Sequence, residues 1–331
     1  MATIYDVAAL AGVSPATVSR VFNGRTVSDD RAQRVRDAAA SLSFTPNRTA
    51  RTLRRQSSEV IALIIPDIQN PFFTALARGV EDRAQSSGYS VVLCNTDDDP
   101  VKEARYLQIA ISENMAGVVL VPASDSSDLS IMVGQGRPVV TVDRTTAFDV
   151  DHVMIDNRPA GASVTGSLFD AGYTRIACIA GPESVVTAIE RAGGWRETVE
   201  SRGAYDADPY LKIANHRVDG GRAAMAELLD LPDAPDAVVA TNNLMGVGAL
   251  QVLNERGLTP PAFGVGVIGG LPFTTLSPGL ITLVHLPTHD LGTTAVSMLV
   301  SRIDGATEPA RTVVLPGVLT AATTAATRDA D

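Results

Sequence analysis

Apolar, strand-like runs alternate with amphipathic helical segments from residue 60 to residue 315, and this alternation limits the possible folds more than any other feature of the sequence. Alternation of this kind predicts parallel β-sheets with helices on both faces. The strands are too numerous for one compact sheet, so we expect an α/β body of two lobes. The predicted strands span residues 60–65, 89–94, 117–121, 138–142, 175–180, 237–240, 264–268 and 312–315, and the predicted helices span 72–87, 102–113, 158–171, 187–202, 220–230, 245–256 and 291–303.

The order of these segments also predicts how the chain divides between the two lobes. The last predicted helix and strand come late enough to return to the first lobe, which we place at residues 59–156 and 287–318. The second lobe then spans residues 157–286. The C-terminal stretch, residues 319–331, is small and polar, and we expect a flexible tail there.

Residues 1–58 carry a charge opposite to that of the rest of the chain. They contain nine arginines and four aspartates, a net charge of +5, whereas the remainder holds 18 basic and 33 acidic residues, a net charge of −15. A small basic module joined to a large acidic body is typical of a nucleic-acid-binding domain attached to another domain. A basic surface without a nucleic-acid partner is the alternative that charge alone leaves open.

Three short helices are predicted in the basic module, which we place at residues 1–45. The first begins with a capping box between Thr3 and Asp6. The second has Ser14 as its N-cap and a proline at its first position, and the third begins at Ser28. A helix, a short turn and a second helix with a narrow apolar stripe predict an all-α helix-turn-helix head.

The face of the second helix that points away from its apolar stripe predicts the function of the head. Ala16 and Thr17 are small enough to let the helix N-terminus enter a major groove, and Arg20 has the forked donors to contact guanine. Other polar side chains nearby can hold phosphates. A three-helix bundle without a ligand is the competing interpretation, but this face carries Thr, Ser, Arg and Asn with no acid among them. The predicted DNA contacts of the head are Thr3, Tyr5, Pro15, Ala16, Thr17, Ser19, Arg20 and Asn23.

Residues 46–58 form a basic linker that begins at Pro46 and has one apolar anchor, Leu53. The segment is compatible with a helix but too short to be stable alone, so we expect it to order only against a partner. A leucine flanked by arginines is suited to act as a wedge in a minor-groove base step. An ordinary flexible linker with one stray leucine is the alternative.

Residues 2–58 resemble the N-terminus of LacI/GalR-family transcriptional regulators, through the runs TIYDVAALAGVSPATVSRVFNG and SDDRAQRVRDAAASLSFTPNRTARTLRR. The resemblance implies that the second helix reads the major groove and that the linker is a hinge helix. It also implies that Leu53 intercalates at the operator centre and that Arg54 follows it into the minor groove.

Ligands of open parallel sheets bind beyond the carboxyl ends of the strands, so two facing lobes would form a cleft that a small molecule can close. Residues just after strands, and at a crossover between the lobes, are therefore candidate ligand contacts. The two phenylalanines after the first strand offer aromatic faces that can stack on a sugar or a base. The candidates found by this rule are Asn70, Phe72, Phe73, Asp143, Arg144 and Asn157.

The body resembles the periplasmic-binding-protein-like effector domain of the same family, and this resemblance implies further contacts at Arg191 and His216. Where the family often has aspartates, this chain has Asn243 and Leu271. A polyol would therefore leave fewer hydroxyls satisfied, and an anionic ligand near Arg144 or Arg191 would meet less repulsion. We expect the pocket to have changed its ligand.

Enzymatic functions have little support in the sequence. Residues 264–269 satisfy the dinucleotide fingerprint G-x-G-x-x-G, but the motif is itself the predicted strand, and prolines follow it instead of a helix. The chain has no serine-hydrolase, Walker A or zinc-protease motif, and its four histidines lack metal-ligand spacing. We therefore predict no catalytic residue, no metal and no cofactor.

The sequence also bears on the compartment. No apolar run is long enough to span a membrane, no signal peptide is visible, and only two cysteines occur, so we expect a cytoplasmic protein without a membrane partner. A solute-binding protein that feeds a transporter is the second candidate class. Two lobes allow that function, but it requires export and leaves residues 1–58 unexplained.

Taken together, these patterns predict a homodimeric DNA-binding regulator, and we expect a repressor of a metabolic or transport operon. Two head helices related by a two-fold axis would read a palindromic operator in double-stranded DNA. A small effector, either a sugar or another metabolite, would close the cleft and weaken operator binding through a change in lobe arrangement.

Overall fold

The protein folds into two compact units in a computed structural model that describes six stretches of the chain. One unit comprises residues 1–57 and the other residues 58–331. Each unit has its own hydrophobic core. The described residues are 2–22, 26–44, 58–124, 126–202, 205–271 and 278–323.

The described residues of the first unit form three helices, and the predicted capping box starts the first of them. Asp6 N donates to Thr3 Oγ1 at 3.4 Å, and Thr3 N donates to Asp6 Oδ2 at 2.7 Å. The bond from the Thr3 backbone N–H is the main reason that the pKa of Asp6 lies below its usual value. Gly12 ends the helix with a φ of 64°, a left-handed conformation that glycine adopts without strain. The three helices are α1 (Ile4–Ala11), α2 (Pro15–Phe22) and α3 (Asp29–Ser41).

The core of this unit is small and contains one fully buried valine from each helix. Val7, Val18 and Val35 are inaccessible to solvent, and alanines of α1 and α3 surround them. The narrow apolar stripe predicted for the second helix therefore packs into this core. Ser28 precedes α3 as predicted, but its side chain makes no capping bond. The two aspartates of the first turn still favour this helix N-terminus through its dipole.

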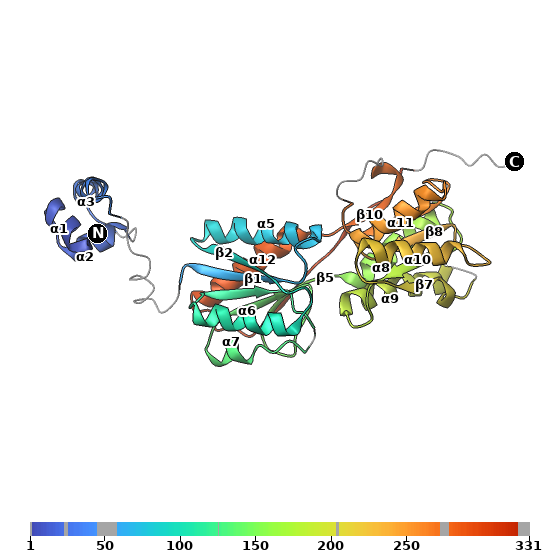
Figure 1. Cartoon of the computed structure of the whole chain (residues 1–331), viewed down its shortest axis with the longest axis horizontal. Helices are drawn as coiled ribbons and strands as arrows, with labels where there is room; N and C mark the ends of the chain where they lie inside the picture. The colour runs from blue at the N-terminus through green and yellow to red at the C-terminus, as the bar shows by residue number, and fades with distance from the viewer. Residues whose placement is uncertain are drawn as a thin grey trace. The chain divides into compact units, whose positions relative to one another are not determined.

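The first lobe of the second unit (Figure 1) is built on a six-stranded parallel sheet with the order β11-β5-β4-β3-β1-β2. Helices α5 and α12 pack on one face, and α6 and α7 pack on the other. Because both faces are covered, the central strands are apolar throughout. The strands are β1 (Val60–Ile65), β2 (Ser90–Asn95), β3 (Gly117–Leu120), β4 (Val139–Val142), β5 (Asp151–Ile155) and β11 (Thr312–Leu315), and the helices are α5 (Pro71–Ser86), α6 (Pro100–Ser112), α7 (Ser130–Gly134) and α12 (Thr288–Ile303).

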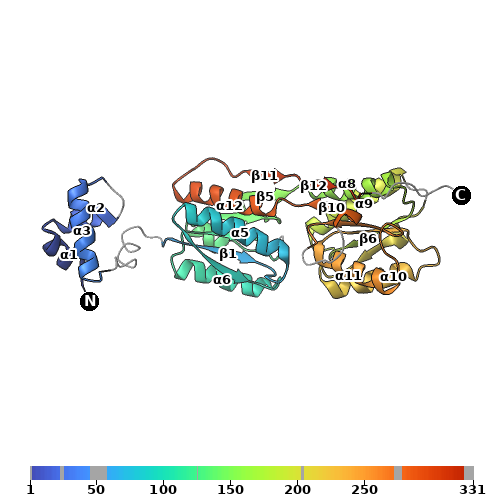
Figure 2. The same cartoon turned by 90° about the horizontal axis from the view of Figure 1, so that it is seen from above.

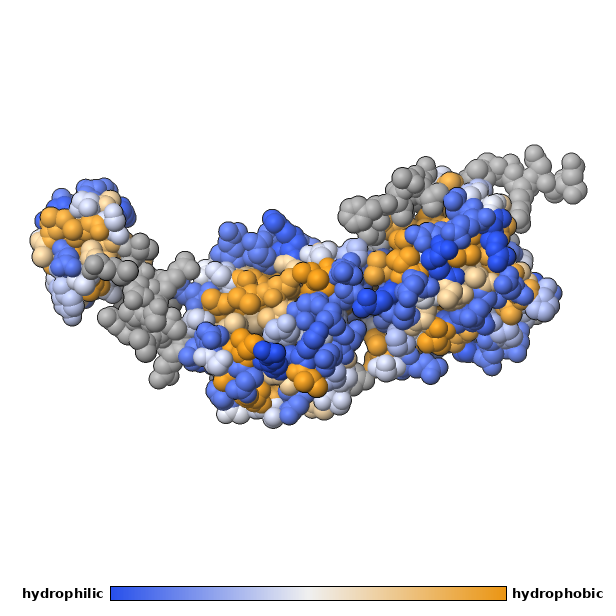
Figure 3. Space-filling model, in the orientation of Figure 1, coloured by the Kyte–Doolittle hydropathy of each residue, from blue (hydrophilic) through white to orange (hydrophobic). Residues whose placement is uncertain are grey.

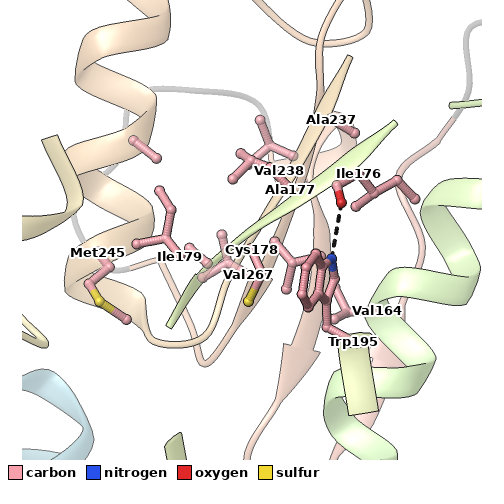
Figure 4. Close-up of a cluster of buried hydrophobic side chains, with 14 of the residues drawn as sticks. Val164, Ile176, Ala177, Cys178, Ile179, Trp195, Ala237, Val238, Met245 and Val267 are labelled. Atoms are coloured by element: carbon pink, nitrogen blue, oxygen red, sulfur yellow. Dashed lines mark hydrogen bonds between the residues drawn. The ribbon is translucent and has the colours of Figure 1, made fainter. Parts of the chain in front are cut away.

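The second lobe (Figure 2) repeats this plan with the strand order β12-β10-β9-β8-β6-β7, in which only β12 is antiparallel. Trp195, the only tryptophan of the sequence, is fully buried in its core, and its Nε1 donates to Ile176 O at 3.1 Å (Figure 4). The strands are β6 (Ile176–Ala180), β7 (Leu211–Ile213), β8 (Ala237–Ala240), β9 (Gly264–Ile268), β10 (Thr282–His285) and β12 (Val318–Thr320), the helices are α8 (Asn157–Asp170), α9 (Val186–Arg202), α10 (Val218–Leu229) and α11 (Asn243–Glu255), and two 3-10 turns are η1 (Asp208–Tyr210) and η2 (Pro278–Leu280).

Both cysteines of the chain are buried, one in each lobe. Cys94 lies on β2 and Cys178 on β6. Burial raises the pKa of both thiols above the usual value, and the larger effect is on the fully enclosed Cys178. Both thiols are therefore protonated at neutral pH.

The C-terminal segment differs from the sequence-based prediction. β12 pairs with β10, with Val318 opposite His285 and Thr320 opposite Leu283. Residues 318–320 are therefore part of the second sheet. The sequence-based prediction placed residue 318 in the first lobe and residues 319–320 in a flexible tail. A three-residue strand is too short to show periodicity, and its position is determined by the backbone partners that the edge of β10 offers. The chain passes between the two sheets three times, after β5, β10 and β11.

Candidate functional site

α2 presents the predicted DNA-reading side chains on the surface of the head. Val18 is fully buried on the inner face of α2, whereas Ala16 and Arg20 are exposed. Tyr5 of α1 is 71% exposed. Thr17 is held at the start of α2 because its backbone N–H donates to the hydroxyl of the N-cap serine at 3.2 Å. α2 contains no acidic residue, so its exposed face is suited to a polyanion.

The remaining predicted DNA contacts divide into two groups. In the described part of the head, Thr3 is exposed, and Pro15 and Ser19 are half-buried. The second group lies outside the described residues, so its assignment stays a prediction. This group comprises Asn23, Leu53, Arg54 and most of the linker 46–58.

A cavity of about 450 Å³ is lined by residues of both lobes. It lies at the carboxyl ends of the parallel strands, where open α/β sheets bind ligands, and its size suits a small molecule. All but one of the predicted effector contacts line it, and the exception is Asn157. The predicted residues that line the cavity are Asn70, Phe72, Phe73, Asp143, Arg144, Arg191, His216, Asn243 and Leu271.

Arg191 projects from α9 and is held by neutral groups. Its side chain is buried, Nε donates to Asn157 Oδ1 at 2.7 Å, and Nη1 donates to Thr241 O at 2.9 Å. Burial lowers the pKa of Arg191, and the charge of Asp143 opposes this shift. Asn157 is itself anchored, because its Nδ2 donates to Ile155 O at 3.1 Å. Asn157 is therefore not among the residues that line the cavity and instead positions Arg191, so its role as an effector contact stays a prediction.

Reciprocal glycines bring α8 and α9 into backbone contact beside Arg191. Gly161 of α8 packs against the carbonyl group of Arg191, and Gly194 of α9 packs against the carbonyl group of Arg158. A side chain at either glycine would collide with the facing backbone. This close approach fixes the position of the Arg191 backbone relative to α8, and with it the position of the Arg191 side chain in the cavity wall.

Asp143 and Arg144 form a buried pair of neighbours after β4. Asp143 adopts a φ of 66°, an uncommon conformation for a non-glycine residue. Arg144 Nη1 donates to Asp98 Oδ1 at 2.8 Å and to Pro122 O at 3.0 Å. Asp143 Oδ1 and Arg144 Nε are buried and have no hydrogen-bond partner among the described residues. Strained backbone and orphaned polar atoms of this kind are typical of ligand sites.

His216 faces the cavity from the loop that follows β7. Its imidazole packs against Gly181, where a side chain would occupy the same space. Its carbonyl oxygen accepts a hydrogen bond from Asn242 Nδ2 at 2.9 Å. Burial, together with the charges of Arg191 and Arg144, lowers the pKa of His216 to about 4. The imidazole is therefore neutral at physiological pH.

Asn70 and the two phenylalanines line the first-lobe side. Asn70 Oδ1 accepts the backbone N–H of Phe72 at 3.0 Å and so caps α5. The rings of Phe72 and Phe73 meet edge to face with centroids 5.1 Å apart. Their arrangement offers the cavity an apolar surface that suits the carbon face of a ring.

Several cavity residues were not predicted from the sequence. Asp67 and Asp98 follow β1 and β2, so the strand-end rule applied to each strand would have found them. Asn215 and Arg217 follow β7, and His285 ends β10. β7 and β10 were not recognised in the sequence, so the strand-end rule could not identify Asn215, Arg217 or His285.

The described part of the chain gives no support to a metal centre or a membrane segment. No group of three or more His, Cys, Asp or Glu side chains within it could hold a metal ion. None of the helices described is both long and apolar enough to cross a membrane.

A helix-turn-helix head joined to a two-lobed α/β domain with a ligand-sized cavity defines a class of protein, the bacterial transcription regulators with a periplasmic-binding-protein-like domain. Residues 3–47 match the bacterial regulatory proteins of the lacI family. Residues 58–323 match the periplasmic binding proteins and sugar binding domain of the LacI family. The chain belongs to the LacI family of bacterial regulatory proteins.

Individual relatives cover nearly the whole chain. The ribose operon repressor of Escherichia coli (strain K12) is 36% identical over 310 residues, which are 92% of this chain and 93% of that protein. The solved complex of the transcriptional regulator CelR with cellobiose is 31% identical, with a TM-score of 0.72 over 98% of this chain and 100% of that one. The Lac repressor dimer bound to operator and the anti-inducer ONPF shares the fold, with 23% identity and a TM-score of 0.83 over 96% of this chain and 97% of that one. The family is regulatory rather than enzymatic, so the dinucleotide-enzyme alternative is rejected.

Proposed function

We propose that the protein is a homodimeric repressor of a metabolic or transport operon, and that a small molecule in the cavity controls its binding to a palindromic operator. The observation that carries this proposal is the exposed, acid-free face of α2 on a unit separate from a ligand-sized cavity. One head offers too few side chains for specific affinity, so a two-fold dimer is required to read a palindrome. A regulator of this kind works on DNA in the cytoplasm.

Base reading is assigned to α2 and to the linker. Arg20 donates to guanine O6 and N7 in the major groove, while Ala16 and Thr17 let the helix N-terminus approach the bases. Leu53 acts as a wedge in the minor groove, and Arg54 follows it there. Phosphate contacts from the rest of the head set the register of the head on the duplex.

The edge of the first sheet supports the dimer. β2 is the last strand of that sheet, and Val92 and Leu93 are 41% and 40% exposed. Figure 3 shows apolar residues gathered along this edge between α5 and α6. An unpaired apolar strand edge favours association. A second copy of the chain is the occupant that we propose.

Effector control follows from the way in which the lobes are connected. Three chain segments join the two sheets, and the linker to the head enters the first lobe directly at β1. A ligand that closes the cleft changes the lobe arrangement and with it the separation of the two linkers in a dimer. Coupling between two sites of this kind is typically about 1–3 kcal/mol.

The experiment that tests DNA recognition compares Arg20→Ala with Arg36→Ala by fluorescence anisotropy on a library of palindromic duplexes. Arg20→Ala should lower affinity by roughly 1–3 kcal/mol and relax the preference at one guanine per half-site. Arg36 is an exposed arginine of α3, so Arg36→Ala removes the same charge outside α2 and should weaken all duplexes alike. Equal losses on every sequence for Arg20→Ala would contradict base reading. A wild-type protein without preference for any palindrome would overturn the proposed function.

A further inference from the structure

The two walls of the cavity carry opposite charge. The lining residues from the first lobe include three aspartates and one arginine, a net charge of −2. The second lobe contributes Arg191 and Arg217. None of the described residues that line the cavity from this lobe is acidic, so its wall has a net charge of +2 when histidines are counted as neutral. A ligand that spans the cavity therefore meets an acidic wall on one side and a basic wall on the other.

Of the two cations on the second wall, Arg191 is the one that we expect an anionic ligand group to pair with. Arg217 has a carboxylate within reach, since its Nη2 lies 4.0 Å from Asp67 Oδ2. Arg191 is 7% exposed, and its two hydrogen bonds go to the neutral oxygens of Asn157 and Thr241. A guanidinium has five N–H donors, so others are available to a ligand. The charge of Asp143 favours the cationic form of Arg191, but no carboxylate accepts a hydrogen bond from it among the described residues. A buried cation whose hydrogen bonds go to neutral oxygens is costly, and an anionic ligand group would offset that cost.

The first wall, in contrast, requires a ligand group that both donates and accepts a hydrogen bond. Asp98 already pairs with Arg144 Nη1 at 2.8 Å. Two buried atoms nearby, Asp143 Oδ1 and Arg144 Nε, have no partner in the described structure. The carboxylate oxygen accepts a hydrogen bond and the guanidinium nitrogen donates one. A single ligand hydroxyl can both donate to Asp143 and accept from Arg144.

We propose that the cavity binds a small polyhydroxy carboxylate, a sugar acid, with its carboxylate against Arg191 and His216 and a hydroxyl between Asp143 and Arg144. This inference rests on the proposed function, because it specifies the effector of the same site. The planar carboxylate matches the guanidinium fork, and its negative charge balances the positive charge of Arg191. The neutral imidazole of His216 supplies one further N–H.

Asn243 offers a direct test of the charge of the second wall. It lies in the cavity lining with 5% exposure, and its Oδ1 accepts the backbone N–H of Leu244 at 2.9 Å. Asn243→Asp keeps the size of the side chain and the oxygen that accepts this bond. The substitution also adds a negative charge to the second wall, where we place the ligand carboxylate. Asn254→Asp is the matched control, because Asn254 is an exposed residue of the same helix, α11.

The experiment measures binding to the full chain by isothermal titration calorimetry at pH 7.5. The probes are D-ribonate and D-gluconate with their neutral partners D-ribose and D-glucose, together with D-glucuronate, ribose 5-phosphate and glucose 6-phosphate. At least one sugar acid should bind about tenfold more tightly than the corresponding neutral sugar. Asn243→Asp should weaken that sugar acid about tenfold, and Asn254→Asp should leave its affinity unchanged.

Four results would overturn the inference: a neutral sugar that binds as tightly as its acid, binding of the phosphates alone, no sugar-acid binding at millimolar concentration, or equal effects of the two variants. The palindrome preference of the wild-type protein is measured on the same preparation. If that preference is present while the sugar acids fail, the effector assignment is wrong and the regulator function stands. If the preference itself is missing, the proposed function is wrong.

Discussion

Gly161→Ala should weaken the second lobe, because α8 and α9 meet backbone to backbone at this glycine. A Cβ at residue 161 would lie 2.9 Å from the carbonyl carbon of Arg191 and nearer still to its oxygen, whereas ordinary contacts are 3.4–4 Å. The helices would have to separate by more than about 0.5 Å, and overpacking of a dense interior costs about 1–3 kcal/mol. Since Arg191 forms part of the cavity wall, the same displacement should also weaken effector binding.

Gly166→Ala is the matched control for this prediction. Gly166 lies on the same helix, but a Cβ there would meet only the flexible end of Arg202, at 3.7 Å. Both substitutions gain about 1 kcal/mol of helix propensity, so the difference between the variants isolates the backbone collision. Urea unfolding followed by the fluorescence of Trp195, which lies in the core of this lobe, measures that difference. Gly161→Ala should unfold with a free energy about 1–3 kcal/mol below that of Gly166→Ala, and equal values would refute the reasoning.

Three further predictions concern other parts of the chain. Burial raises the pKa of Asp151, but bonds from Arg302 at 2.8 and 2.9 Å and from the Arg311 N–H outweigh this effect and leave the pKa below its usual value. The stabilisation should therefore be complete at neutral pH and disappear as the pH falls through the lowered pKa. Asp151→Asn should cost roughly 3 kcal/mol in urea unfolding at pH 7 and progressively less in acid, whereas a pH-independent cost would contradict this account. Val92→Asp should convert the proposed dimer to a monomer of 34.6 kDa in light scattering, and a dimer that persists would exclude the β2 edge as the interface. Thr3→Ala removes the hydroxyl of the capping box and should destabilise the head by about 0.5–2 kcal/mol in thermal circular dichroism, while an unchanged melting curve would show that the cap does not contribute.

The sequence predicts those parts of the fold whose signal is local. β1, β8 and β9 begin and end at the predicted residues because each is a buried apolar run. β5 was missed because it begins with Asp151 and His152 and has only three apolar residues, and β12 was missed because it has only three residues, all of them exposed. Pairing with a neighbouring strand, which a local pattern does not reveal, defines these two elements.

The residues that line the cavity could be predicted only where the preceding strand was recognised in the sequence. Arg144 and Phe72 follow recognised strands and line the cavity as expected. The contact of Asn157 with Arg191 was not predicted, because it joins residues 34 positions apart in the chain. The opposite charge of the two walls arises from residues on separate lobes, so only the folded chain reveals it.

The burial of both cysteines makes the protein a convenient background for attached probes. Maleimides react with thiolates at accessible positions, and neither Cys94 nor Cys178 meets this requirement in the folded chain. A pair of cysteines introduced at exposed positions, one in each lobe, would therefore accept fluorophores without removal of the native residues. Energy transfer between such dyes would report the distance between the lobes directly as a metabolite is added.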